Sequence, residues 1–191
     1  MDRIEEKLKA GKRLSKLDAP KNINNHEMIM KENDFIVSKT DTKGFITYVN
    51  RIFVDMAGWT RQELIGANHN IIRHPDMPKI AFKILWDLIS SKQEFFGFVK
   101  NLRKDGGYYW VFAYITADLD LNDNIIGYTS FRKKPSQKGI ETLTPIYKAL
   151  VEAEKNGGMN ASYELLKSTL NATDENIIEK YNELVFNLQK G

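Results

Sequence analysis

Four side chains that can bind an anion or a metal ion lie close together in the sequence: His69, Arg73, His74 and Asp76. Pro75 stiffens the backbone between them, because a proline fixes its own φ and restricts the residue before it. Arginine carries a permanent charge and a fork of donors, which suit a phosphate or carboxylate group. A stiff polar loop followed by aromatic residues is typical of a pocket for a small molecule with anionic and ring-like parts.

Each candidate residue also has an ordinary structural explanation. His74, which precedes a proline, can be a hydrogen-bonded loop residue, and Arg73 and Asp76 can form a structural ion pair. Trp86 lies in an amphipathic segment, where a tryptophan is by default part of the core. Asn50 follows a predicted strand, which is the position of a helix N-cap. The residues taken one by one leave these alternatives open.

The composition excludes several kinds of site and partner. The chain has 191 residues and no cysteine, which excludes cysteine-based zinc, iron–sulfur and thiol chemistry and indicates a reducing compartment. No apolar run reaches the roughly 18–20 residues that cross a bilayer, so we expect no direct membrane insertion and a cytoplasmic location. The net charge of +3 is mild. We interpret the run Arg132-Lys133-Lys134 as a solvated strand edge, and we expect no nucleic-acid binding.

Turn signals and hydrophobic periodicity predict an α+β core of five strands with helices between the second and the third. The predicted strands are 34–39, 45–49, 94–104, 108–119 and 124–133. The predicted helices are 51–57, a short one opened by the capping box of Thr60 and Glu63, and 78–90. Strand 108–119 is apolar on both faces, so both must be covered. We expect helices and a ligand on one face, and the N-terminal arm, the C-terminal helices or a second chain on the other.

Changes in composition divide the chain into three segments. Residues 1–33 read as an N-terminal helical arm (1–17) and a linker, residues 34–135 as the core domain, and residues 136–191 as a C-terminal helical extension. In the extension, Thr144-Pro145 is a good cap pair and predicts the start of a helix that Gly157-Gly158 ends. Two further amphipathic helices are predicted at 161–170 and 174–188.

This order of elements resembles a PAS sensor domain, in which a five-stranded antiparallel sheet has helices on one face. Two motifs carry the general resemblance: 44–50 (GFITYVN) and 58–66 (GWTRQELIG). The segment 69–78 (HNIIRHPDMP), with Phe82 and Trp86 after it, is similar more narrowly to the PAS domain of Aer-type aerotaxis and bipartite energy-taxis receptors. The resemblance covers about residues 34–150.

The resemblance implies non-covalent binding of FAD, whose redox state reports on electron transport. Arg73 would bind the pyrophosphate, Trp86 and Tyr109 would form walls for the isoalloxazine ring, and Gly97 would leave room for that ring. The implied flavin-contact positions, together with the wall residue Tyr109, are Asn50, His69, Arg73, His74, Asp76, Trp86, Asn101 and Tyr109. Phe95 stands where the family often has tryptophan, a departure that would alter how tightly the ring is held.

The same resemblance implies a signalling role in energy taxis and chemotaxis, with no enzymatic activity and no metal site. The chain lacks the membrane segment, HAMP-like region and long coiled coil of a full receptor, so it is either a fragment or the sensor half of a two-protein receptor. We favour the second, because the helices after the core supply docking surfaces. Its partner would be a membrane-anchored chemotaxis-type transducer, which would bring the flavoprotein to the membrane. A homodimer through the sheet face or the N-terminal arm is a further expectation.

Four other functions are alternatives to this one. A haem-binding oxygen sensor would use His69 or His74 as the iron ligand, and a ligand-free PAS interaction module would have no cavity. A light sensor of the LOV kind needs a cysteine that this chain lacks. A flavoenzyme would need a substrate-handling acid/base pair or a dinucleotide fingerprint, and neither is found.

Overall fold

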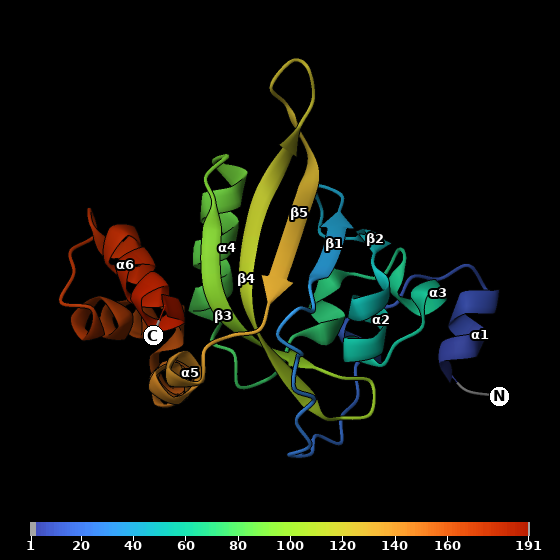
Figure 1. The fold of residues 1–191 in the computed structure, drawn as a ribbon, viewed down its shortest axis with the longest axis horizontal. Helices are drawn as coiled ribbons and strands as arrows, with labels where there is room; N and C mark the ends of the chain where they lie inside the picture. The colour runs from blue at the N-terminus through green and yellow to red at the C-terminus, as the bar shows by residue number, and fades with distance from the viewer. Residues whose placement is uncertain (1–2, 191) are drawn as a thin grey trace.

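The computed structural model describes residues 3–190; positions 1, 2 and 191 of the predicted arm and extension lie outside it. One five-stranded antiparallel sheet, in the order β2-β1-β5-β4-β3, forms the centre. In Figure 1 the C-terminal helices lie beside β3, and the N-terminal helix lies at the opposite end of the molecule, beyond β1 and β2. The α+β PAS architecture predicted from the sequence is confirmed.

The five strands fall where alternation and turn residues predicted them, and they are shorter at several ends. They are β1 (Ile36–Thr40), β2 (Ile46–Val49), β3 (Phe95–Leu102), β4 (Tyr108–Leu119) and β5 (Ile125–Lys133). Gly97 pairs with Ala113, and Ala113 pairs with Arg132 across the next ladder. This register puts every second residue of three neighbouring strands on the same inner face.

Short helices follow β2 and cover the inner face of the sheet. They are α2 (Arg51–Ala57), α3 (Arg61–Leu64), the 3-10 turn η2 (His69–Ile72) and α4 (Lys79–Ser90). Gly58 ends α2 in the left-handed region at φ 72°, and Thr60 and Glu63 form the predicted capping box. Helix α4 packs against β3 and β4 with its apolar stripe and so closes one side of the site.

The first helix of the C-terminal extension starts earlier than predicted. Helix α5 (Gln137–Thr169) is capped by Ser136, and Pro145 lies inside it, so the predicted start at Thr144-Pro145 is wrong. An internal proline costs a helix roughly 3 kcal/mol. The burial of Leu143 and Tyr147 on either side of it offsets that cost. Gly157 and Gly158 have non-helical backbone angles and kink α5 where a helix end was predicted.

Helices α5 and α6 (Ile177–Lys190) cover the outer face of the sheet near β3. The ring of Tyr147 stacks on Trp110, with ring centroids 6.3 Å apart, and its hydroxyl donates to the carbonyl of Phe98 at 2.9 Å. Phe186 of α6 packs on Phe96 with centroids 4.5 Å apart. The apolar outer face of strand 108–119 is therefore covered in part by the C-terminal helices, one of the three covers expected from the sequence.

The N-terminal arm packs on its own domain. It comprises α1 (Arg3–Lys9) and the 3-10 turn η1 (Lys16–Asp18). Leu14 is buried, and its carbonyl accepts a hydrogen bond from the backbone N–H of Asn68 at 3.1 Å. The following segment forms a parallel bridge between Glu27 and Tyr108. Within residues 3–190, no helix is long and apolar enough to cross a membrane.

Candidate functional site

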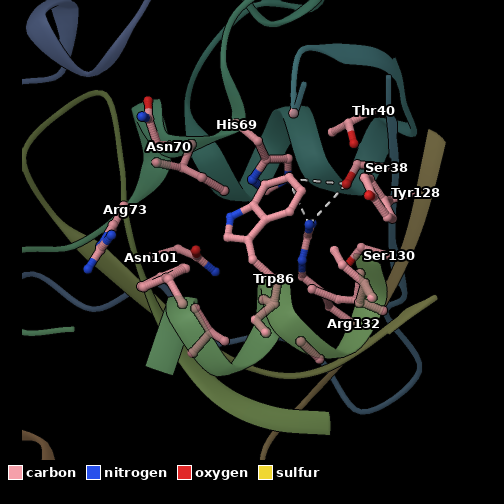
Figure 2. A pocket seen from close by; sticks show the side chains of 18 of the residues that line it. Ser38, Thr40, His69, Asn70, Arg73, Trp86, Asn101, Tyr128, Ser130 and Arg132 are labelled. Atoms are coloured by element: carbon pink, nitrogen blue, oxygen red, sulfur yellow. Dashed lines mark hydrogen bonds between the residues drawn. The ribbon is translucent and has the colours of Figure 1, made fainter. Parts of the chain in front are cut away.

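A cavity of about 310 Å³ lies between the inner face of the sheet, η2 and α4. Strands β1, β3, β4 and β5 supply its floor, and α4 supplies a wall of apolar side chains (Figure 2). Its polar lining comes from several elements: Ser38, Thr40, Asn68, His69, Asn70, Arg73, Asn101, Tyr128, Ser130 and Arg132. Among them, Arg132 is a strand residue that reaches across the cavity floor.

The guanidinium of Arg132 joins β5 to β1 and to η2. Its Nη2 donates to Ser38 Oγ at 2.9 Å and lies 2.8 Å from His69 Nε2, as the dashed lines in Figure 2 mark. It also lies over the ring of Phe53, 5.1 Å from the centroid. Phe53 in turn stacks on the His69 ring, with centroids 5.7 Å apart. One cation therefore contacts three side chains, those of Ser38, His69 and Phe53.

Arg132 was interpreted from the sequence as part of a solvated strand edge, and that interpretation is wrong. The side chain is only 4% exposed. Alternation along β5 puts Arg132 on the inner face with Ser130 and Tyr128, whereas Lys133 points outward, where its Nζ lies over the Phe112 ring. Counting the alternation forward from Tyr128 through Ser130 would have placed Arg132 on the inner face. Reading the three basic residues as one run concealed this.

Burial keeps His69 neutral. Desolvation, and then the charge of Arg132, lower the pKa of His69 to about 3. A neutral imidazole whose Nε2 accepts the Arg132 N–H carries its proton on Nδ1. Desolvation also lowers the pKa of Arg132 to about 10, which still leaves the guanidinium charged at neutral pH. The network is therefore one positive charge held by neutral acceptors.

Several buried polar atoms around the cavity lack a hydrogen-bond partner among residues 3–190. They are Nη1 of Arg132, Nδ2 of Asn101 and Oγ of Ser130, and all three residues line the cavity. Buried polar groups in native proteins are nearly always satisfied, so such atoms call for a ligand or water. Two of them are pure donors, which indicates a ligand with acceptor atoms such as ring carbonyls.

Four of the eight residues predicted for the site line the cavity: His69, Arg73, Trp86 and Asn101. The guanidinium of Arg73 lies over the Phe82 ring, 3.9 Å from its centroid, and Figure 2 shows it turned away from the middle of the cavity. Trp86 is 40% exposed and packs edge-on against Tyr128, with centroids 5.4 Å apart. Arg73 is a cation at the rim, Trp86 is an aromatic wall, Asn101 supplies an amide, and His69 supplies a neutral imidazole.

The other four predicted residues lie outside the cavity lining. Asn50 caps α2, and Tyr109 is fully buried with no partner for its hydroxyl in the described part of the chain. His74 is buried against Tyr108, and its Nδ1 accepts from the backbone N–H of Asp76 at 3.1 Å. The Asp76 carboxylate pairs with Lys100 at 2.7 Å and forms no ion pair with Arg73. Their roles toward a ligand remain predictions.

The sequence suggested that Gly97 leaves space for a ligand ring, and this prediction is wrong. A Cβ at this position would lie 2.7 Å from the Tyr181 hydroxyl and 2.8 Å from the Phe95 ring. The space beside Gly97 is taken by these two side chains, whose rings stack with centroids 6.2 Å apart. Sequence alternation placed Gly97 on the correct face, but it carried no information about where α6 returns to the sheet.

Neither His69 nor His74 has an arrangement that suits haem. His69 Nε2 is taken by Arg132, and His74 is outside the cavity lining. Residues 3–190 also contain no group of three or more histidine, cysteine or carboxylate side chains that could hold a metal ion. The donors that do line the cavity suit an organic ligand with acceptor atoms better than an iron centre.

Comparison with known proteins identifies the domain. The protein family described as PAS fold matches residues 46–132, which include β2 to β5 and the whole η2–α4 wall. This part of the chain is a PAS domain. The domain is similar in structure to the blue-light photoreceptor Aureochrome1 LOV in its light state. The TM-score is 0.50 at 21% identity, over 65% of this chain and 92% of that one, and the likeness supports the fold alone.

The sequence of the PAS domain is similar to segments of longer signalling proteins. It is 42% identical over 115 residues to the aerotaxis receptor of Escherichia coli (strain K12), over 60% of this chain and 22% of the receptor. It is 26% identical over 97 residues to the nitrogen fixation regulatory protein of Klebsiella pneumoniae, over 51% of this chain and 20% of that protein. The chain thus spans about a fifth of the length of these relatives.

Proposed function

We propose that the cavity binds FAD non-covalently and that the chain is a redox sensor for energy taxis. The observation that carries the proposal is the set of buried, unpartnered polar atoms of Arg132, Asn101 and Ser130 around one cavity. The identity of 42% over 115 residues to an aerotaxis receptor supports a sensor of the same kind. An isoalloxazine ring has the acceptor atoms that these donors require.

The size of the cavity fits the ring part of the cofactor. Its volume of 310 Å³ lies at the lower end of the range of about 300–1,000 Å³ for ligand pockets. The ring would lie inside, with Trp86 as a wall and Asn101 as an amide contact, and the phosphates would lie at the rim. Arg73 at that rim is suited to bind the pyrophosphate. The four predicted residues outside the cavity lining would then influence FAD binding indirectly, by holding the loop and strands that carry the contact residues. They are His74, Asp76, Asn50 and Tyr109.

Bound FAD would supply reversible electron uptake, and the protein would turn it into a signal without enzymatic activity. The cavity residues orient the ring and exclude water. The partner would be a membrane-anchored chemotaxis-type transducer, so that a cytoplasmic sensor works at the membrane through another protein. The similarity to an aerotaxis receptor supports this partner class. Helices α5 and α6 and the outer face of the sheet supply the surface for the transducer or for a second copy of the chain.

An absorption spectrum of the purified protein tests the proposal. We expect flavin bands that bleach with dithionite and return in air, and release of FAD on denaturation. The variant N101A, which removes the cavity amide, should retain less FAD at equal folded content. The variant N156A, an exposed asparagine of α5, is the matched control. A colourless protein that FAD does not reconstitute would refute the proposal, and a Soret band would replace flavin with haem.

A further inference from the structure

We infer that Arg132 is the side chain by which the site distinguishes reduced flavin from oxidised flavin, an inference that rests on the proposed function. It is a fully buried cation on the cavity floor, 4% exposed, with one buried Nη1 that has no partner among residues 3–190. A buried charge is normally paired or bound to a ligand of opposite charge. Among residues 3–190, Arg132 forms no ion pair with any carboxylate.

The groups that do contact Arg132 are uncharged. Ser38 Oγ accepts a hydrogen bond, His69 Nε2 lies 2.8 Å away, and the Phe53 ring faces the guanidinium. The depressed pKa of His69, about 3, agrees with a neutral imidazole here. Tyr109, also buried on the inner face, has its pKa raised by burial and stays a neutral phenol. The positive charge therefore remains uncompensated when the cavity holds a neutral ligand.

Reduction supplies the missing negative charge. The oxidised isoalloxazine ring is neutral; on taking two electrons from a donor and one proton, at N5, it carries a charge of −1 on its pyrimidine part. On reoxidation by dioxygen or another acceptor, the two electrons and the N5 proton leave together. A cation in a water-poor cavity favours the charged form strongly. Asn101 and Ser130 are neutral donors that serve both forms, so Arg132 provides the difference in binding.

The hydrogen bonds of Arg132 would couple the redox state of the flavin to the conformation of the protein. Arg132 holds Ser38 of β1 and His69 of η2 with a single nitrogen, Nη2. A guanidinium drawn toward an anionic ring weakens one or both of these bonds. Since β1 and η2 lie on different walls of the cavity, reduction would loosen the connection between the sheet and the loop that carries Arg73.

Midpoint potentials of R132Q, R132K and K133Q test the inference. We expect R132Q to bind reduced FAD at least tenfold more weakly relative to oxidised FAD, a fall of about 30 mV or more for a two-electron couple. R132K, which keeps the charge without the fork of donors, should fall between R132Q and the wild type. K133Q removes one charge from the adjacent, outward-facing residue and should leave the potential unchanged. Equal potentials in R132Q and K133Q would overturn the inference while leaving flavin binding intact.

The wild-type protein provides a second test that holds even where R132Q loses the cofactor. Uptake of one proton with two electrons predicts a potential that falls by about 30 mV per pH unit near neutral pH, whereas uptake of two protons gives about 59 mV. The smaller slope supports an anionic reduced flavin beside Arg132, and the larger slope contradicts it. Absence of any bound flavin would refute the proposed function together with this inference.

Discussion

Asn50 shows at the scale of one residue how a predicted ligand contact can have a structural role. Its side-chain oxygen accepts from the backbone N–H groups of Val37 and Phe53, each at 3.1 Å, and its amide donates to the carbonyl of Phe35 at 2.7 Å. These bonds cap α2 and join it to β1. The N-cap alternative is therefore confirmed, and the flavin contact remains a prediction.

The variant N50A separates the two roles. Loss of the cap and of the bonds to β1 should lower the free energy of unfolding by about 2 kcal/mol. Urea denaturation measures that loss, and the FAD content of the folded fraction should stay at the wild-type level. N50D keeps both acceptor bonds and should lose less stability. A folded N50A protein without FAD would instead support direct contact with the cofactor.

His69 makes stability depend on pH. Its folded pKa of about 3 lies below the ordinary 6.5, so the unfolded chain binds the extra proton first as pH falls. The contribution of neutral His69 to the free energy of unfolding is complete above pH 6.5 and is lost progressively as the pH falls toward 3. Between pH 7.5 and pH 5, His69 should account for a loss of about 2 kcal/mol.

Chemical denaturation of H69Q at the two pH values checks this expectation. The pH-dependent loss should be smaller in H69Q by about 2 kcal/mol, while H26Q, which replaces an exposed histidine, should behave like the wild type. His74, whose pKa is lowered to about 4 chiefly by burial, contributes in the same direction in all three proteins. An undiminished pH dependence in H69Q would show that His69 is not buried as a neutral group.

At the scale of elements, one carboxylate of α5 completes the start of α4. Pro78, the N-cap of α4, makes no side-chain capping bond, and Glu154 accepts from the backbone N–H of Ile80 at 2.9 Å instead. The Glu154 carboxylate also lies close enough to raise the pKa of Arg73, against the larger lowering by burial. Glu154 thus connects the C-terminal extension directly to the first turn of the helix that forms the cavity wall.

Replacement of Glu154 tests that connection. E154A should lower the free energy of unfolding by about 1 kcal/mol, as loss of an N-cap does, and should speed amide exchange at the first turn of α4. E154Q keeps the acceptor and should exchange more slowly than E154A. E152A, which loses an exposed pair with Lys155 and a long hydrogen bond from the Asn156 amide, is the control. Unchanged exchange in E154A would mean that the cap is not formed in solution.

Local sequence patterns predicted the elements whose residues determine their own structure. Strand β4 and helix α2 match their predicted bounds, because alternation, an N-cap and a left-handed glycine are all local signals. The start of α5 was missed because the packing of Leu143 and Tyr147 on the sheet overrides the local effect of Pro145. The inner-face position of Arg132 follows from the alternation along β5, whereas its contacts with Ser38 and His69 depend on the strand order and have no local signal.

For the whole molecule, the C-terminal extension is part of the core. Phe98, Trp110 and Phe112 of the outer face are at most 6% exposed because α5 and α6 lie over that part of the sheet. Burial of a large apolar side chain contributes roughly 1.5–3 kcal/mol. The proposed division at residue 135 therefore does not imply two independently stable units.

A chain shortened to residues 1–135 should be less stable by several kcal/mol and should self-associate through the uncovered aromatic patch. Thermal unfolding and sedimentation velocity measure the two effects. Removal of residues 1–9 is the control, because residues 3–9 contain no buried side chain. A shortened protein that stays monomeric with an unchanged melting temperature would show that the outer face is stable without its helices.

Trp86 gives the cavity its own optical signal. Of the three tryptophans in the chain, Trp59 and Trp110 are at most 6% exposed, whereas the indole of Trp86 is 40% exposed and lines the cavity. The indole fluorescence that responds to solvent therefore comes mainly from the residue beside the ligand. A bound flavin would quench it, and the W86F variant would identify the contribution, so occupancy of the site can be followed by light emission without any label.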